Sequence, residues 1–121
     1  GGGMKGDLKA PVKGEIDKYL NNRFGFFDSV FDIGLDPGEN YNLVLPRVSR
    51  IYLFVSGHIS WGSNNGVYMF IYQSTSTPVR VINLAGTWSA TITGGLNGVV
   101  KIETTNGSGI RGCVYMVSET Y

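Results

Sequence analysis

The sequence is poor in the side chains that most catalytic and metal sites require. Its 121 residues include one cysteine and one histidine, Cys113 and His58. A single cysteine excludes a disulfide within the chain, and zinc sites draw several ligands from these two residue types. His58 lacks a G-x-S-x-G or similar nucleophile context, and Cys113 stands in an apolar run where nothing nearby would lower its pKa. We therefore predict a protein that is not an enzyme and needs no cofactor.

Charge is also scarce, and long apolar runs are missing. Charged residues make up 16% of the chain, against roughly a quarter in an average soluble protein. Ten basic residues nearly balance nine acidic ones and are scattered among them, so we expect no nucleic-acid partner. No apolar run approaches the ~20 residues of a membrane span, and we expect no membrane insertion. The low charge suggests that partner chains cover part of the surface.

Calcium is the metal with the most support in the sequence. Oxygen-bearing side chains lie close together between residues 28 and 40, namely Asp28, Asp32, Asp36, Glu39 and Asn40. Their spacing does not match an EF-hand, and Asp36-Pro37-Gly38 is typical of a tight turn. We therefore predict no metal site.

The chain has two regions of different composition. Residues 1–23 hold four of the five lysines, and they open with three glycines that we interpret as a cloning remnant before Met4. Residues 14–20 could form a short helical turn with Ile16 and Leu20 on one side. We expect residues 1–23 to be a lead-in segment or the junction to a shaft, and residues 24–121 to be one folded domain.

From residue 24 onward the pattern is that of short strands. Runs rich in Val, Ile, Tyr, Phe and Thr are separated by clusters of Gly, Asn, Ser and Pro. The expected strands are residues 26–33, 41–45, 50–60, 67–74, 79–84, 87–93, 99–105 and 110–119. About eight closely spaced strands predict an all-β fold, an antiparallel β-sandwich with a jelly-roll-like topology. A seven-stranded immunoglobulin-like topology stays open.

Alternation gives the central strands two apolar sides. In residues 50–60 and 67–72, aliphatic side chains occupy one side and aromatic ones the other. The aromatic side consists of Tyr52, Phe54, Tyr68, Phe70 and Tyr72. A sandwich sheet normally buries only one face, so the second needs a cover from a loop, the N-terminal segment or another subunit. We predict that these five residues line the interface of a homo-oligomer, most simply a trimer.

Aromatic residues beside polar loops are the candidate ligand contacts. They are Trp61, Asn64, Asn65, Tyr41 and Trp88. Sugars stack on such rings while amides bond their hydroxyl groups, although both tryptophans could instead anchor the core or an interface. Loops 34–40, 61–66 and 105–109 are the natural places for variable contacts.

The chain resembles the C-terminal head domains of bacteriophage tail fibres. The resemblance lies in the run Tyr52–Tyr72, the turns rich in Gly, Asn, Ser and Thr, and the ending Gly98–Tyr121 with its closing strand at residues 110–117. It covers residues 24–121. It implies a trimeric virion protein at the tip of a fibre, otherwise extracellular, that recognises a bacterial surface glycan or protein. Alternatives are a trimeric interaction domain similar to tumour necrosis factor or complement C1q, and a carbohydrate-binding module.

Overall fold

The computed structural model describes residues 27–57 and 64–120, and its side chains over 30–57 and 64–117. His58 and Trp61 lie outside these ranges. The elements are β1 (Phe27–Leu35), β2 (Asn40–Val44), β3 (Arg50–Ser56), β4 (Asn65–Tyr72), β5 (Arg80–Thr87), β6 (Thr91–Gly94), the 3₁₀ helix η1 (Leu96–Gly98), β7 (Val99–Glu103) and β8 (Ile110–Thr120). Within the described residues, no helix is long and apolar enough to cross a membrane.

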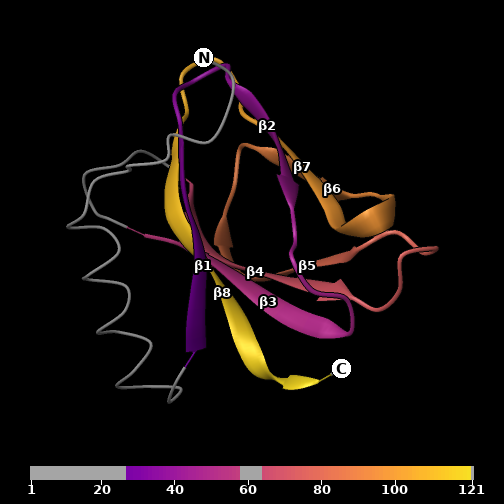
Figure 1. Ribbon diagram of the computed structural model, residues 1–121. Coiled ribbons are helices and arrows are strands. Elements are labelled where there is room, and N and C mark those ends of the chain that lie inside the picture. Colours follow the sequence, from indigo (N-terminus) through magenta and orange to yellow (C-terminus); the bar gives the residue numbers. More distant parts are fainter. Residues whose placement is uncertain (1–26, 58–63, 121) are drawn as a thin grey trace.

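The eight strands form two antiparallel sheets. One sheet has five strands in the order β1-β8-β3-β4-β5, and the other has three in the order β2-β7-β6. Figure 1 shows the three-stranded sheet lying across the upper right of the five-stranded one. The predicted all-β class and the expectation of about eight strands are confirmed, in an arrangement consistent with a β-sandwich.

Successive strands run in alternating directions, which sorts the connections between two ends of the molecule. We call the end formed by residues 36–39, 57, 64, 88–90 and 104–109 the loop end. We call the opposite end, formed by residues 45–49, 73–79 and 95–98, the entry end, because β1 begins there at Phe27. In Figure 1 the β1–β2 turn and the β7–β8 loop meet at the top, and the C-terminus lies below.

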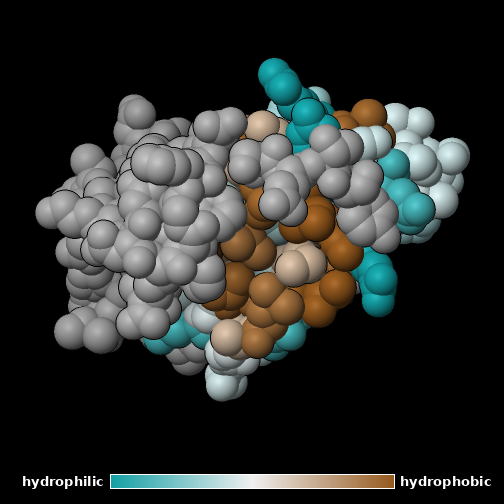
Figure 2. All heavy atoms as spheres, turned by 90° about the horizontal axis from the view of Figure 1, so that it is seen from below, coloured by the Kyte–Doolittle hydropathy of each residue, from teal (hydrophilic) through white to brown (hydrophobic). Residues whose placement is uncertain are grey.

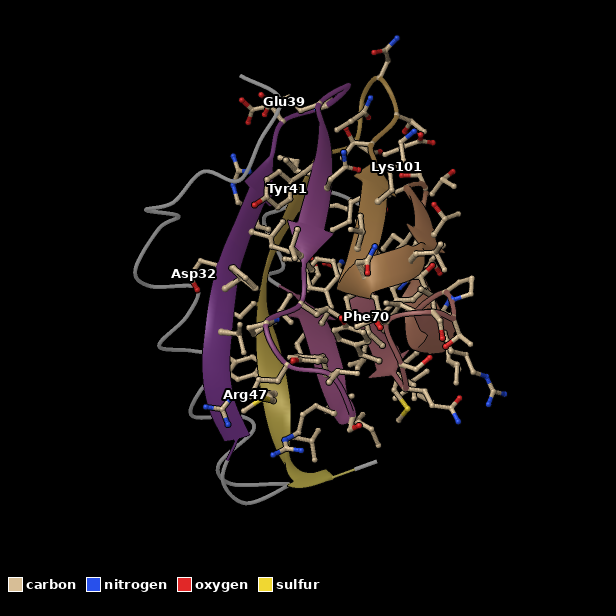
Figure 3. All side chains as sticks on the ribbon, turned by 45° about the vertical axis from the view of Figure 1, so that its right-hand side comes forward. Asp32, Glu39, Tyr41, Arg47, Phe70 and Lys101 are labelled. Atoms are coloured by element: carbon tan, nitrogen blue, oxygen red, sulfur yellow. The ribbon has the colours of Figure 1, made fainter. Side chains whose placement is uncertain are left out.

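The core lies between the sheets and is built from the aromatic side of the central strands. Tyr52, Phe54 and Phe70 are fully buried, and Tyr72 nearly so. Side chains from the other sheet pack against them, and these are Leu43, Ile92, Val100 and Ile102. Figure 3 shows Phe70 between the layers and Lys101 pointing away from them.

The predicted interface therefore needs correction. Tyr52, Phe54, Phe70 and Tyr72 fill the core of one chain, and Tyr68 is half-buried against the same core. Their cover is the three-stranded sheet, so no second subunit is needed to bury them. The apolar side that lacks a second sheet is the aliphatic one.

The strand boundaries near Gly86 also differ from expectation, because residues 85 and 86, which separate the expected strands at 79–84 and 87–93, lie inside β5. Gly86 pairs directly with Gly66 across β4 and β5, and both have positive φ, 93° and 149°. A Cβ on Gly86 would collide with the carbonyl of Asn65, so this close approach requires glycine. As a result β5 continues to Thr87, and the expected strand at 87–93 is reduced to residues 91–94.

The outward faces of the two sheets differ in chemistry. On the five-stranded sheet, the outward positions form what we call the apolar face: Ile51, Leu53, Val55, Val67, Met69, Ile71, Ile82, Cys113, Tyr115 and Val117. On the three-stranded sheet, they form the polar face: Asn40, Asn42, Thr91, Thr93, Lys101 and Glu103, with Val44 and Val99 at its entry end. Seen from below, apolar side chains gather on the side where the five-stranded sheet lies (Figure 2).

Candidate recognition site

A buried asparagine ties the loops of the loop end together. Asn64 is 1% exposed. Its Nδ2 donates to the carbonyl of Gly109 over 2.9 Å, and its Oδ1 accepts from the Ser89 backbone N–H over 2.6 Å. The Ser89 hydroxyl donates to the same Oδ1 over 3.1 Å. Three connections that are distant in sequence are thereby fixed to one side chain.

The backbone around Asn64 is held as well. The Ser56 hydroxyl lies 2.6 Å from the Asn64 carbonyl oxygen and 2.8 Å from that of Arg111. Ser56 is itself buried. The predicted role of Asn64 as a ligand contact therefore needs correction, because its amide is bonded inside the protein on both its nitrogen and its oxygen.

The turn between β1 and β2 joins the same end. Gly38 has φ 85°, and Glu39 N–H donates to the Asp36 carbonyl over 3.0 Å, so the turn expected at 36–39 is confirmed. The buried Thr104 hydroxyl donates to the carbonyls of Asp36 and Glu39. Gly38 N–H reaches the Thr105 carbonyl over 3.1 Å, which fastens the turn to the β7–β8 loop.

Acidic residues near this turn have partners of different kinds. Asp36 Oδ1 lies 3.2 Å from a guanidinium nitrogen of Arg111. The Cys113 thiol donates to Asp32 Oδ1 over 2.9 Å, on the outer side of β1. Among the described residues, no group of three or more His, Cys, Asp or Glu side chains is arranged to hold a metal ion.

An aromatic cluster of Trp88, Tyr68 and Phe54 lies beside the hydrogen bonds of Asn64. The ring centroids of Trp88 and Tyr68 are 4.8 Å apart in an edge-to-face arrangement, and Phe54 lies 5.7 Å from Trp88. The indole N–H donates to the Ala85 carbonyl over 3.2 Å. Burial raises the pKa of the Tyr68 hydroxyl above its usual value. Trp88 packs against the core and is half-buried, so part of its surface is open to solvent.

The other predicted ligand residues are dispersed. Tyr41 is half-buried and packs against the core, and Asn65 is exposed at the start of β4, at the loop end. The structure thus brings Asn64, Asn65 and Trp88 to one end. The sequence analysis did not identify Ser56, at the end of β3, or Ser89, because a serine carries no signal for a partner many residues away.

The surface of the loop end suits hydrogen bonding rather than catalysis. Its exposed polar side chains are Asp36, Asn65, Ser89, Thr105 and Asn106, and the half-buried Trp88 adjoins them. Hydroxyl, amide and carboxylate groups can bond the hydroxyl groups of a sugar or the backbone of a peptide, while an aromatic edge adds apolar contact. Glu39 and Arg47 mark the two opposite ends in Figure 3.

Comparison of the chain with protein-family models, with curated proteins and with solved structures found no match.

Proposed function

We propose that this chain is the receptor-binding head of a bacteriophage tail fibre, which recognises a glycan or protein on the bacterial surface through its loop end. One observation carries the proposal. The described chain enters β1 at one end of the sandwich, and the described residues of the four polar connections lie at the other end. A shaft joined to the start of β1 would therefore lie at the end opposite to these loops.

The bracing of these loops supports the same role. Asn64, Ser89, Thr104 and Gly109 link the connections by hydrogen bonds, so little chain entropy would be lost when a ligand binds. Binding residues are commonly carried on loops that a rigid β scaffold positions. A set of loops that is fixed internally and polar externally fits recognition better than it fits chemistry.

The topology is compatible with the head domains that the chain resembles. The first strand pairs with the last, and β2 pairs with β7 in the facing sheet. We propose that this nested order is a jelly-roll variant in which the β3-β4-β5 meander stays within one sheet. The proposal includes assembly into a trimer on the virion, as the resemblance implies.

The test is adsorption of the fluorescently labelled chain to a panel of bacteria and to an array of bacterial surface polysaccharides. Asn106→Arg places a bulky charge at the loop end, and Thr75→Arg places the same charge at the entry end, where Thr75 is also exposed. We expect the native chain to bind at least one strain and Asn106→Arg to bind at least about tenfold more weakly. Thr75→Arg should bind as the native chain does. Equal loss in both variants, or no binding across the panel, would contradict the proposal.

A second candidate is a carbohydrate-binding module, favoured by the edge-to-face ring pair of Trp88 and Tyr68. Such a module would bind soluble oligosaccharide as a monomer, whereas a fibre head should bind whole cells as a trimer. Sedimentation velocity of the chain with and without soluble glycan separates the two.

A further inference from the structure

Part of the apolar face is buried although it points away from the core. Cys113 is 0% exposed, Tyr115 1% and Val55 8%. Their register places them on the outward side, since Val55 pairs with Cys113 and Leu53 with Tyr115. The described apolar side chains that pack against them are Leu53 and Val67, which lie on the same face. Neighbours within one face cannot enclose a tyrosine ring from above.

The described apolar side chains therefore do not account for the burial of the Tyr115 ring. We propose that residues 4–26 occupy the apolar face, with an apolar stripe of that segment packed over β8 and β3. This inference goes beyond the proposed function, because it concerns the outward side of the five-stranded sheet and involves none of the loops at the loop end.

The sequence of the segment suits this occupant. Val12, Ile16, Tyr19 and Leu20 recur at the intervals of one side of a helix. Pro11 stands just before them, where proline is tolerated at the first turn. The residues between them are Lys13, Gly14, Glu15, Asp17 and Lys18, and four of these five are charged. An apolar stripe backed by charges is what a cover needs, with one side toward the sheet and the other toward water.

The place where the segment joins the fold gives it the necessary reach. Phe27 pairs with Val117, which is two residues along β8 from Tyr115. Residues 21–26 could span roughly 20 Å when extended. Crossing from β1 to β5 takes four strand spacings, about 19 Å. Ten residues of helix would cover about 15 Å, enough to lie over β8, β3 and β4.

The single cysteine provides the probe. Cys113 should react slowly with a nitrophenyl disulfide reagent in the native chain, because its thiol is buried on the covered face. In the 121-residue chain, Ile16→Asp puts a negative charge in the stripe, and Lys18→Asp puts the same charge on its polar side. Both variants should retain the two sheets, and far-ultraviolet circular dichroism checks this.

We expect Ile16→Asp to speed the reaction of Cys113 at least roughly tenfold, since the free energy of burying one isoleucine is lost from the cover. Leu20→Asp should act likewise, and Lys18→Asp should leave the rate within about twofold. Unchanged rates in both stripe variants would overturn the proposal. So would a native rate that rises on dilution, which would assign the cover to a second copy of the chain.

Discussion

The outward faces of the two sheets differ in chemistry, although side chains alternate between inward and outward positions in both. The polar face of the three-stranded sheet carries Asn42, Thr93 and Lys101 over a buried layer of Val100 and Ile102. This is the half-buried pattern of an antiparallel sheet with water on one side. The apolar face of the five-stranded sheet has aliphatic residues where the other has amides and hydroxyl groups.

The difference shows that burial is not confined to the inner side of the five-stranded sheet. Its inner side is covered by β2, β7 and β6, which accounts for the aromatic residues. Its outer side is buried around Cys113 and Tyr115, and half-buried farther out at Leu53 and Met69. An apolar face of this kind would promote aggregation if water covered it. We therefore expect substitutions on the two outward faces to have unequal effects.

The largest difference is expected between Tyr115→Ala and Asn42→Ala. Tyr115 is enclosed on the apolar face, and truncating an enclosed aromatic ring should lower the free energy of unfolding by about 3–5 kcal/mol. Asn42 is exposed on the polar face, and its loss should change that free energy by less than about 0.5 kcal/mol. Urea unfolding followed by tryptophan fluorescence measures both. Similar values for the two variants would remove the distinction between the faces.

Next comes a matched introduction of charge, Leu53→Asp against Val99→Asp. Both side chains are half-buried and point outward, one from each sheet. An aspartate among Met69 and Tyr115 would lose solvation without a partner, so Leu53→Asp should cost about 2–4 kcal/mol. Val99→Asp should cost about 1 kcal/mol or less, since water reaches the polar face. The same urea titrations report the result, and a larger cost for Val99→Asp would reverse the comparison.

A polar contact at the loop end gives an intermediate effect. Asn64→Ala leaves the Ser89 N–H and the Gly109 carbonyl without their bonding partner. The cost should be about 1–3 kcal/mol, below that of Tyr115→Ala. Hydrogen exchange should also rise at the amides of residues 88–90. If exchange there stays at the native rate, Asn64 does not brace the loops.

Tyr52 lies in the core between the two sheets, and its substitution should have a smaller effect on stability that depends on pH. Burial raises the pKa of its hydroxyl, which bonds the Arg47 backbone over 2.8 Å. The neutral form is therefore favoured in the folded chain, and stability should fall as pH rises above the unfolded value near 10. Tyr52→Phe should flatten that fall between pH 9 and 11, on the order of 1 kcal/mol or less. Urea midpoints across this range test it, and an unchanged slope would contradict it.

The smallest effect is expected at the ion pair of the polar face. Lys101 Nζ lies 2.7 Å from Glu103 Oε1, but both side chains are well exposed. Solvent screens such a pair, so Lys101→Ala should change stability by less than about 0.5 kcal/mol. A loss above 1 kcal/mol, on the same urea scale, would show that the polar face is also covered.

The sequence predicted the composition of each strand face but not which face is inner. Tyr52 and Leu53 lie on opposite sides of one strand, and both are apolar enough to be core. The choice depends on the second sheet, whose short strands contribute few buried residues, such as Leu43 and Ile92. Their pairing with the aromatic side is a tertiary fact that periodicity does not contain.

The candidate site was predicted in part for a similar reason. The loops at 34–40 and 105–109 were expected from turn residues such as Pro37 and Gly107, and the structure places these loops side by side. Asn64 was expected to face a ligand. Its bonds reach Ser89 and Gly109, 25 and 45 positions away, and no local pattern reveals contacts at such separations.

The most direct test of the contrast between the faces uses two thiols in one chain. Thr93→Cys adds an exposed thiol to the polar face, and the native Cys113 reports on the apolar face. With a nitrophenyl disulfide reagent, we expect one equivalent to react at the rate of a free thiol and the second at least about a hundredfold more slowly. Two equivalents released at one fast rate would show that the apolar face lies open to water, and would contradict the account.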